Sequence, residues 1–519
     1  MSPTPWARRP ESVGQIVAAH ARSAPGRPAF FADDAELTWL EYERRSDRVA
    51  SRFVSEGFQP GERIAVWLPD GPAVHVVWVG AEKAGLVVVG IGPRAGEREL
   101  RHLLARSGAV GFVSAAEHRG LDTRAIAADM QREGPLRRHV VVEAGFGESE
   151  ALAPPVEGRA LGPDDLFLLN STSGTTGLPK LVMHDQRRWL HFHDWAVAAG
   201  ALREDDVFLS ALPAPFGFGI WTAHVTPTLL GAPTVLLPDF DAVALAAAIE
   251  RHGVTVLAAV TTQFILLLES GETARRDLSS LRVLFTGGEA VPYERAARFE
   301  DETGARVLQF YGSNETGALS RTTLEDDREV RLRTAGHVIP EMEVRLFDDD
   351  GRDVTASGRG QPGCRGPATS RGYFGDEAAN AALNTSDGWT LTGDVATLDE
   401  DGVLRIVGRK ADFIIRGGKN VSGAVVEAEV TTHPGVALAA AVPRPDPVFG
   451  ERVCVYVQPR PGARPTLEEI CGHLRERGVS AEYLPEYLVL VDELPRASGG
   501  KVAKQALRED LARRMAETG

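Results

Sequence analysis

The sequence predicts an α/β fold whose sheets are substantially parallel, on three observations. Over the first 160 residues, segments with apolar residues at helical spacing alternate with short apolar runs that turn residues interrupt. The same alternation recurs between residues 207 and 315. After Gly336 the pattern changes to short strands and turns, and a mixed pattern starts again at about Phe413, which indicates more than one domain.

The first elements follow one another closely along the chain. Apolar residues at helical spacing before a glycine predict a helix over residues 37–57, and "AVHVVWVGAEKAG" predicts another over 73–85. Between and after them, "RIAVWLP" (63–69) and "LVVVGIG" (86–92) are typical of buried strands.

The second alternating region predicts further strands and helices. The expected strands cover 207–213, 233–238, 254–260, 281–289 and 306–315, and the expected helices 244–253 and 292–304. Beyond this region, "EVRLFDDDGRDV" (343–354) predicts a β-hairpin. We expect the main domain boundary near "GRKAD", residues 408–412.

Composition narrows the class of protein. The 519 residues carry 57 Lys plus Arg against 72 Asp plus Glu, a net charge of −15 without a basic run, which argues against nucleic acid or an anionic membrane as partner. The three cysteines form no C-x-x-C pair, so neither a disulfide framework nor a zinc cluster is expected. The apolar runs are too short to span a bilayer, and the start lacks a signal-peptide pattern. The cytoplasm is therefore the expected location.

The stretch "STSGTTGLPK", residues 171–180, combines glycines, hydroxyl side chains and a lysine. Glycines allow a ligand close to the backbone, and amides, hydroxyls and a cation suit a polyphosphate. The stretch differs from the common P-loop, because Pro179 separates the second glycine from Lys180. From composition alone, an ordinary surface loop is the alternative.

Further motifs follow in a fixed order: "TGGEAVP" (286–292), "YGSNETG" (311–317), "GWTLTGD" (388–394), "GRKADFIIRGGKN" (408–420) and "LPRASGGK" (494–501). With the glycine-rich stretch, they make the chain resemble the adenylate-forming superfamily of acyl- and aryl-CoA ligases, peptide-synthetase adenylation domains and luciferases. The resemblance extends from about residue 30 to 510 and is strongest to bacterial acyl- and aryl-CoA ligases.

The resemblance implies an architecture and a reaction. It implies an N-terminal AMP-binding domain over 1–408, made of two α/β subdomains and a small β-barrel-like subdomain, a hinge over 409–412 containing Ala411, and a small mobile α+β domain over 413–519. It also implies an AMP-forming acid–thiol ligase. A carboxylate and Mg-ATP would give an acyl-adenylate and pyrophosphate, and coenzyme A would then displace AMP.

The resemblance also assigns the nucleotide site. The β- and γ-phosphates would be held by Thr172, Ser173, Gly174, Thr175, Thr176, Gly177 and Lys180. Adenine would lie against Gly287, Gly288 and Glu289, with Tyr311 and Gly312 beside it, and the ribose would bind Asp394 with help from Arg409.

Catalytic roles follow in the same way. Lys501 would bridge the carboxylate and the α-phosphate, Glu315 with Thr175 would bind Mg²⁺, and Gly418 would leave room for the pantetheine of coenzyme A. Asn314 stands where the family usually has a threonine that contacts the α-phosphate, and Ala411 stands where the hinge usually has Asp or Lys. Two interpretations stay open: neutral drift, or a ligase with impaired adenylation that uses a pre-formed acyl-adenylate from a separate enzyme.

The expected acid pocket is lined by Phe216, Phe218, Thr262, Gly312, Ser313 and Gly317. Its segments contain no Arg or Lys, so a neutral hydrophobic acid is expected, and a natural-product pathway is suggested as its source. No carrier domain is recognised in the sequence, which favours free coenzyme A as acceptor. A separate carrier protein is the alternative, a non-catalytic nucleotide sensor is a rival from another class, and a monomer or homodimer both remain open.

Overall fold

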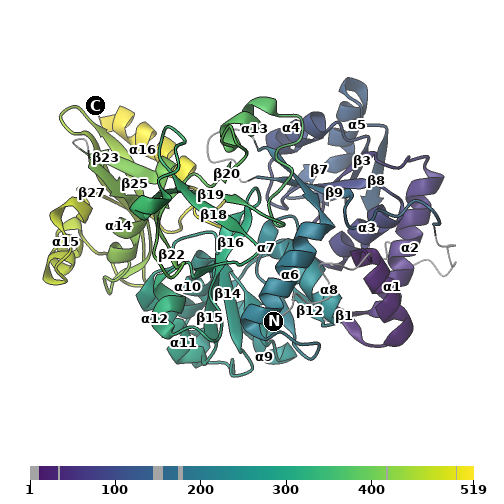
Figure 1. The fold of residues 1–519 in the computed structure, drawn as a ribbon, viewed down its shortest axis with the longest axis horizontal. Helices are drawn as coiled ribbons and strands as arrows, with labels where there is room; N and C mark the ends of the chain where they lie inside the picture. The colour runs from purple at the N-terminus through teal and green to yellow at the C-terminus, as the bar shows by residue number, and fades with distance from the viewer. Residues whose placement is uncertain are drawn as a thin grey trace.

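The structure is a computed structural model that describes residues 11–32, 35–143, 156–172, 179–416, 419–497 and 500–518. The prediction of an α/β fold is confirmed, since helices cover sheets with long parallel sections. Figure 1 shows a large part, coloured purple to green, and a smaller yellow-green part at one end that contains the C-terminus. No helix in the described ranges is long and apolar enough to cross a membrane.

The six-stranded sheet near the N-terminus has the order β10-β9-β4-β3-β5-β8. The strands from β9 to β8 pair in parallel, whereas β10 pairs antiparallel with β9. Parallel strands with covered faces are continuously apolar, as the buried run of β3 illustrates. The strands are β3 (Arg63–Trp67), β4 (Val87–Gly90), β5 (Gly111–Ala115), β8 (Arg138–Val142), β9 (Leu166–Ser171) and β10 (Leu181–Asp185).

The nine-stranded sheet has the order β17-β16-β15-β14-β13-β11-β12-β1-β2. Its central strands are parallel, and antiparallel strands close both edges. The strands are β1 (Pro28–Ala32), β2 (Ala35–Thr38), β11 (Phe208–Ser210), β12 (Thr234–Leu236), β13 (Val256–Ala258), β14 (Val283–Gly287), β15 (Arg306–Ser313), β16 (Gly317–Arg321) and β17 (His337–Val338). The strands and helices predicted up to residue 315 are all present, with ends shifted by a few residues.

Helices fill the space between and around the two sheets. The helix predicted over 37–57 runs over Trp39–Ser55 and starts with a capping box of Thr38 and Glu41. The helices of this part are α1 (Val13–Ser23), α2 (Trp39–Ser55), α3 (Pro72–Lys83), α4 (Glu97–Ser107), α5 (Thr123–Glu133), α6 (Gln186–Gly200), α7 (Gly217–Gly219), α8 (Thr226–Leu230), α9 (Ala242–His252), α10 (Thr261–Ser270), α11 (Tyr293–Thr303) and α12 (Arg328–Arg333).

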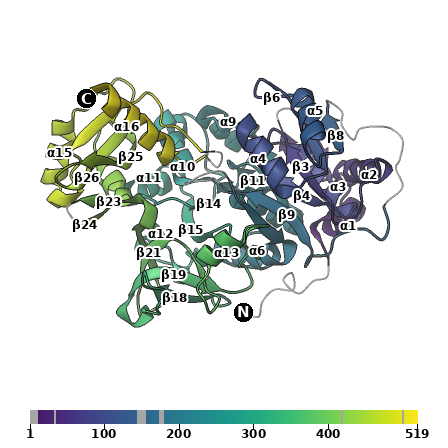
Figure 2. The same ribbon diagram turned by 90° about the horizontal axis from the view of Figure 1, so that it is seen from above.

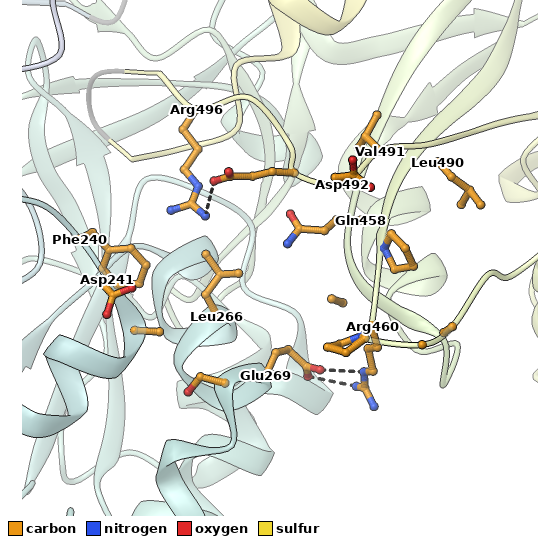
Figure 3. Close-up of a pocket in the computed structure, with 18 of the residues that line it drawn as sticks. Phe240, Asp241, Leu266, Glu269, Gln458, Arg460, Leu490, Val491, Asp492 and Arg496 are labelled. Atoms are coloured by element: carbon orange, nitrogen blue, oxygen red, sulfur yellow. Dashed lines mark hydrogen bonds and ion pairs between the residues drawn. The ribbon is translucent and has the colours of Figure 1, made fainter. Parts of the chain in front are cut away.

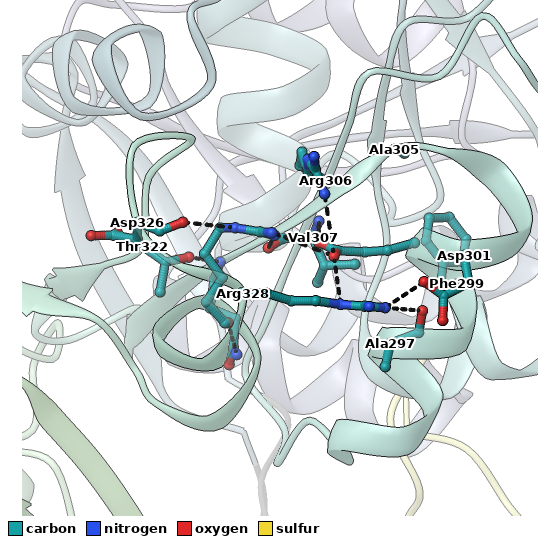
Figure 4. A network of polar contacts seen from close by, with 12 residues as sticks. Ala297, Phe299, Asp301, Ala305, Arg306, Val307, Thr322, Asp326 and Arg328 are labelled. Carbon is teal, nitrogen blue, oxygen red and sulfur yellow. Dashed lines mark hydrogen bonds and ion pairs between the residues drawn. The ribbon is translucent and has the colours of Figure 1, made fainter.

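A buried ion cluster ties α11, β15 and α12 together (Figure 4). Glu300 of α11 is almost fully buried and pairs with Arg331 of α12 and, over 3.2 Å, with Arg328. The same carboxylate accepts the backbone N–H of Val307 over 2.9 Å. Several donors therefore compensate this buried charge, which fixes the strand that leads into the "YGSNETG" turn.

A five-stranded antiparallel sheet follows, made of β18 (Glu343–Phe347), β19 (Arg359–Arg365), β20 (Thr390–Leu391), β21 (Asp394–Leu398) and β22 (Leu404–Arg409). The hairpin predicted within 343–354 is present, with a short second arm. Phe347 bridges Asp353, and the N–H groups of Asp348 and Val354 donate to the carbonyls of Arg352 and Leu346. The full-length partner strand of β18 is β19, which the local pattern does not indicate. Helix α13 (Glu377–Leu383) follows β19.

The C-terminal part has its own five-stranded sheet, with β24, β23, β26 and β25 in order and β27 beside β26. Figure 2 shows this sheet next to α10 and α11 of the large part, and α10 contacts β25 directly. The elements are β23 (Phe413–Arg416), β24 (Lys419–Ser422), β25 (Val436–Asp446), β26 (Gly450–Pro459), β27 (Tyr487–Leu490), α14 (Gly423–Val430), α15 (Leu467–Glu476) and α16 (Lys504–Thr518).

Candidate active site

Lys501 of the C-terminal part reaches the end of β14 in the large part. A Cβ on Gly288 would lie 2.6 Å from the Lys501 ammonium nitrogen, so a larger residue there would displace the end of the lysine side chain. Gly288 also has φ of +76°, a conformation that favours glycine. The predicted catalytic lysine and the predicted adenine strip therefore meet in space, although they are far apart in sequence.

Acidic side chains lie within electrostatic range of the Lys501 ammonium. Burial lowers the pKa of Lys501, and Arg409 lowers it further, whereas the carboxylates of Glu289, Asp394 and Glu315 raise it. All of these residues were predicted site residues. Predicted site residues from four separate motifs therefore act electrostatically on one cation.

The predicted adenine and ribose residues are connected directly. The Tyr311 hydroxyl donates to Asp394 Oδ2 over 2.6 Å, and Arg409 Nε lies 3.9 Å from Asp394 Oδ1. Burial raises the pKa of Asp394, while the Tyr311 hydrogen bond, Arg409 and Lys501 lower it. Asp394 keeps Oδ1 available for a further donor such as a ribose hydroxyl.

Glu315 is held by a residue that the sequence analysis missed. The Tyr373 hydroxyl donates to Glu315 Oε1 over 2.9 Å. The ring of Tyr373 also lies under the Lys180 ammonium, 4.7 Å from its centroid, which is cation–π distance. Tyr373 therefore links the end of the glycine-rich stretch to the predicted metal-binding carboxylate, and no local pattern around residue 373 signals this contact.

The glycine-rich stretch is described only at its ends. Thr172 donates its N–H to the Lys180 carbonyl over 2.9 Å, and the Lys180 N–H donates to Thr172 Oγ1 over 3.1 Å. These bonds bring the two ends together, as a phosphate-binding loop requires. The predicted residues Ser173, Gly174, Thr175, Thr176 and Gly177, and Gly418 of the predicted pantetheine tunnel, lie outside the described residues.

Glu289 and Thr262 form a pair at the other side of the site. The Glu289 carboxylate accepts the Thr262 N–H over 3.2 Å and the Thr262 hydroxyl over 3.2 Å. Thr262 was predicted in the acid pocket and Glu289 beside adenine, so these two predicted surfaces adjoin. The ring of Phe218 comes within 3.3 Å of the place that a Cβ on Gly287 would take, which makes Gly287 the boundary between them.

The "YGSNETG" turn places the remaining pocket residues. A Cβ on Gly312 would lie 1.8 Å from the Gly317 carbonyl oxygen, so this crossing of the chain requires glycine. Ser313 Oγ accepts the N–H groups of Glu315 and Thr316 over 3.2 Å and fixes the turn. Asn314 points toward Gly217, which follows the buried Phe216.

Magnesium would suit this donor set. Mg²⁺ is commonly bound by one or two carboxylates together with substrate phosphates. Glu315 offers a carboxylate that is partly exposed, oriented by Tyr373 and near Lys180. In the described part of the chain no cluster of three or more His, Cys, Asp or Glu side chains could hold a metal ion.

The predicted hinge forms a short 3₁₀ turn over Lys410–Asp412. The Ala411 carbonyl accepts from Arg508 over 3.0 Å, and Arg508 also pairs with Asp412 over 2.9 Å. On the other side of the turn, Lys410 pairs with Asp349 over 2.7 Å. The turn is therefore bonded to the sheet of β18 and to α16 at once.

A second contact between the two parts centres on Glu269 of α10, which we call the Glu269 cluster: Glu269, Arg295, Arg298 and Arg460. The Glu269 carboxylate pairs with Arg295 over 2.6 Å. Across the boundary it pairs with Arg460 over 2.7 Å (Figure 3). Arg295 also donates to the carbonyls of Thr431 and Val436 over 3.0 Å each. Beside the cluster lies a cavity of about 980 Å³ with charged and apolar walls, lined by residues of both parts.

Comparison with known proteins identifies the family. The model described as AMP-binding enzyme matches residues 17–374, and the model described as AMP-binding enzyme C-terminal domain matches 425–501. The chain belongs to the AMP-binding enzyme family. It is an adenylate-forming ligase of that superfamily, as the motifs predicted.

Relatives cover nearly the whole chain. A salicyl-AMP ligase / salicyl-S-ArCP synthetase of Mycobacterium tuberculosis is 34% identical over 92% of this chain and 85% of the relative. A 2-hydroxy-7-methoxy-5-methyl-1-naphthoate–CoA ligase of Streptomyces carzinostaticus is 31% identical over 98% of this chain and 94% of the relative. The fold matches the anthranilate CoA ligase AuaEII in complex with anthranoyl-AMP, with a TM-score of 0.88, 23% identity and 97% of each chain covered.

Proposed function

We propose that the protein activates a hydrophobic carboxylic acid with ATP and transfers the acyl group to the thiol of coenzyme A. The observation that carries this proposal is the approach of Lys501 to Gly288, within the field of Glu289, Asp394 and Glu315. A cation here would face the carboxylate and the α-phosphate at the moment when negative charge shifts between them. Tyr311 would stack on adenine, and Asp394 would hold the ribose.

In the first half-reaction, a carboxylate oxygen of the acid attacks the α-phosphorus of ATP and pyrophosphate leaves. Lys501 neutralises charge on the oxygens that approach each other, and Lys180 with the glycine-rich stretch holds the departing phosphates. Mg²⁺, bound through Glu315, would supply positive charge to these phosphates. In the second half-reaction, the thiol gives its proton to solvent, its sulfur attacks the acyl carbon, and AMP leaves with the electron pair of the anhydride bond.

The aromatic side chains around Phe218 support a hydrophobic acid. Phe218 and Trp221 have ring centroids 5.7 Å apart, and Trp221 lies 5.1 Å from Phe285. Trp221 and Phe285 are buried in the core behind Phe218, so the partly exposed Phe218 ring would offer an apolar surface that suits an aryl or bulky alkyl acid. The relatives whose names specify aryl acids point in the same direction.

Two alternatives differ from this proposal, one in the second half-reaction and one in the first. A carrier protein could replace coenzyme A, as the name of the salicyl-S-ArCP synthetase suggests for that relative. Alternatively, Asn314 could weaken adenylation and leave only thioester formation from a supplied acyl-adenylate. The position of Lys501 beside Gly288 favours a working first step.

The test incubates the protein with Mg-ATP, coenzyme A and a panel of aryl and alkyl acids, and measures acyl-AMP and acyl-CoA by mass spectrometry. A parallel arm supplies synthetic acyl-adenylates without ATP. We expect acyl-CoA in both arms for the same acid. Acyl-CoA from the adenylate arm alone would show that adenylation is lost, acyl-AMP without acyl-CoA would point to a carrier protein, and neither product would reject the proposal.

A further inference from the structure

Arg188 is a buried cation, and within the described ranges its side chain hydrogen-bonds to two uncharged groups. It occupies the first turn of α6 and is 3% exposed. One guanidinium nitrogen donates to His184 Nδ1 over 3.0 Å, and another donates to the Asn314 carbonyl over 2.9 Å. No ion pair of Arg188 is found in the part of the chain that the structure describes, and a guanidinium buried in this way is costly, so a purely structural tether would be better served by a neutral donor.

The state of His184 follows from this contact. Arg188 can only donate, so Nδ1 of His184 is an acceptor and the ring is neutral with its proton on Nε2. Burial and the Arg188 charge both lower the pKa of His184, in agreement with a neutral ring. The ring stacks on Trp189, with centroids 5.6 Å apart, which fixes the direction of the acceptor nitrogen.

The other end of the contact lies in the predicted acid site. Asn314 belongs to the turn that contains Glu315, and the end of its carboxamide lies 2.7 Å from the place of a Cβ on Gly217. A ring carbon of Trp189 lies 3.6 Å from the same place. The Asn314 side chain therefore uses the space that Gly217 leaves free, directly after Phe216 of the predicted pocket.

Arg188 thus connects the first turn of α6 to Asn314, the residue that departs from the family pattern. Burial lowers the pKa of Arg188 to about 10, while Asp185, Glu315 and Cys364 raise it, so the group is charged at neutral pH. Its positive charge lies behind the turn where a substrate carboxylate would arrive, and a carboxylate is favoured by a nearby cation of low solvent exposure.

We propose that Arg188 is a positioning residue of the acid-binding side: it holds the Asn314 backbone so that the Asn314 side chain lies beside Gly217 and sets the place of the substrate's carboxylate. This inference rests on the proposed function. It assigns a role to a residue that lies outside the sequence motifs, and it explains why Asn314 and Gly217 occur together, because a side chain at 217 would collide with the Asn314 carboxamide.

The experiment compares full-length wild type with Arg188→Met, Arg188→Lys and Gly217→Ala, and measures KM for the acid and KM for ATP separately. We expect Arg188→Met to raise KM for the acid by roughly tenfold or more, the size of a lost hydrogen bond to a charged group, with KM for ATP little changed. Arg188→Lys keeps the charge and should recover part of the loss. Gly217→Ala should reproduce the selective rise without touching Arg188.

Arg187→Met is the matched control, because Arg187 is adjacent on α6 but pairs with Asp164 on the surface side. Equal increases of both KM values, or an effect no larger than in the control, would overturn the inference. If Arg188→Met does not fold, Arg188→Lys and Gly217→Ala decide by the same criterion, which is whether KM for the acid rises more than KM for ATP. Absence of acyl-AMP from wild type with every acid would instead reject the proposed function, and this inference with it.

Discussion

The hydroxyl of Tyr311 and the carboxylate of Asp394 are joined by a 2.6 Å hydrogen bond, which makes the expected adenine platform and the expected ribose ligand one unit. Tyr311→Phe keeps the ring and removes this bond. We expect KM for ATP to rise by roughly tenfold, because a hydrogen bond to a charged group contributes about 1.5–3 kcal/mol. KM for the acid should stay constant. Steady-state kinetics with each substrate varied in turn would measure this, and an unchanged KM for ATP would contradict it.

Lys501→Ala should separate the two half-reactions. Loss of a charge that stabilises the transition state commonly costs roughly 10²–10³ in rate, so acyl-AMP formation should fall by that factor. Transfer from a supplied acyl-adenylate to coenzyme A should continue, since the carbonyl is already activated. Lys504→Ala, which removes a lysine on α16 that pairs with Glu427, is the control. Equal losses in both half-reactions would argue against the role given to Lys501.

Buried histidines should make the protein sensitive to mild acid. Burial lowers the pKa of His193 and of His224 to about 3 each, below the ordinary value of 6.5. Below pH 6.5 the unfolded chain therefore binds protons that the folded chain does not bind. The free energy of unfolding is at its full value above that pH and decreases as the pH falls. Each such group costs up to about 1.4 kcal/mol per pH unit.

Urea unfolding midpoints at pH 7.5 and pH 5.5 would measure this loss. His224→Phe removes one titrating group and should flatten the dependence, whereas His337→Gln changes a side chain that is 45% exposed and should not. Equal slopes in wild type and His224→Phe would contradict the prediction.

The Glu269 cluster should favour the arrangement in which Lys501 is in the site. Arg460→Met removes the pair that crosses between the two parts, over 2.7 Å, and keeps the buried Arg295–Glu269 pair. We expect slower acyl-AMP formation, by a few-fold, and unchanged thioester formation from supplied acyl-adenylate. Rapid-quench measurement of each step would show it. Arg464→Met, in the wall of the same cavity, is the control, and equal slowing of both variants would count against the cluster.

Local periodicity predicted the core of the fold well, because buried helices and parallel strands carry their spacing in sequence. It indicated the turn of the 343–354 hairpin, whose second arm is short, but it did not indicate β19, because this longer partner of β18 is chosen by sheet pairing beyond the turn. The site motifs brought Lys501, Asp394 and Glu315 into one expected site by resemblance. Tyr373 and Arg188 were missed because their contacts join residues 58 and 126 positions apart and leave no local pattern. The domain bounds, the hinge and the individual residue roles remain predictions.

The interdomain pairing of Glu269 and Arg460 also bears on how fast the whole cycle can run. If the first step needs the two parts together and the second needs them apart, each turnover must form these ion pairs and break them again. The turnover rate is then highest at an intermediate ion-pair strength. If the pairs are weak, too few molecules adopt the arrangement for the first step, and if they are strong, the two parts separate slowly before the second step. Raising the salt concentration weakens partly exposed pairs. The overall rate of wild type could therefore rise with moderate salt before it falls, even though no group that touches the substrates has changed.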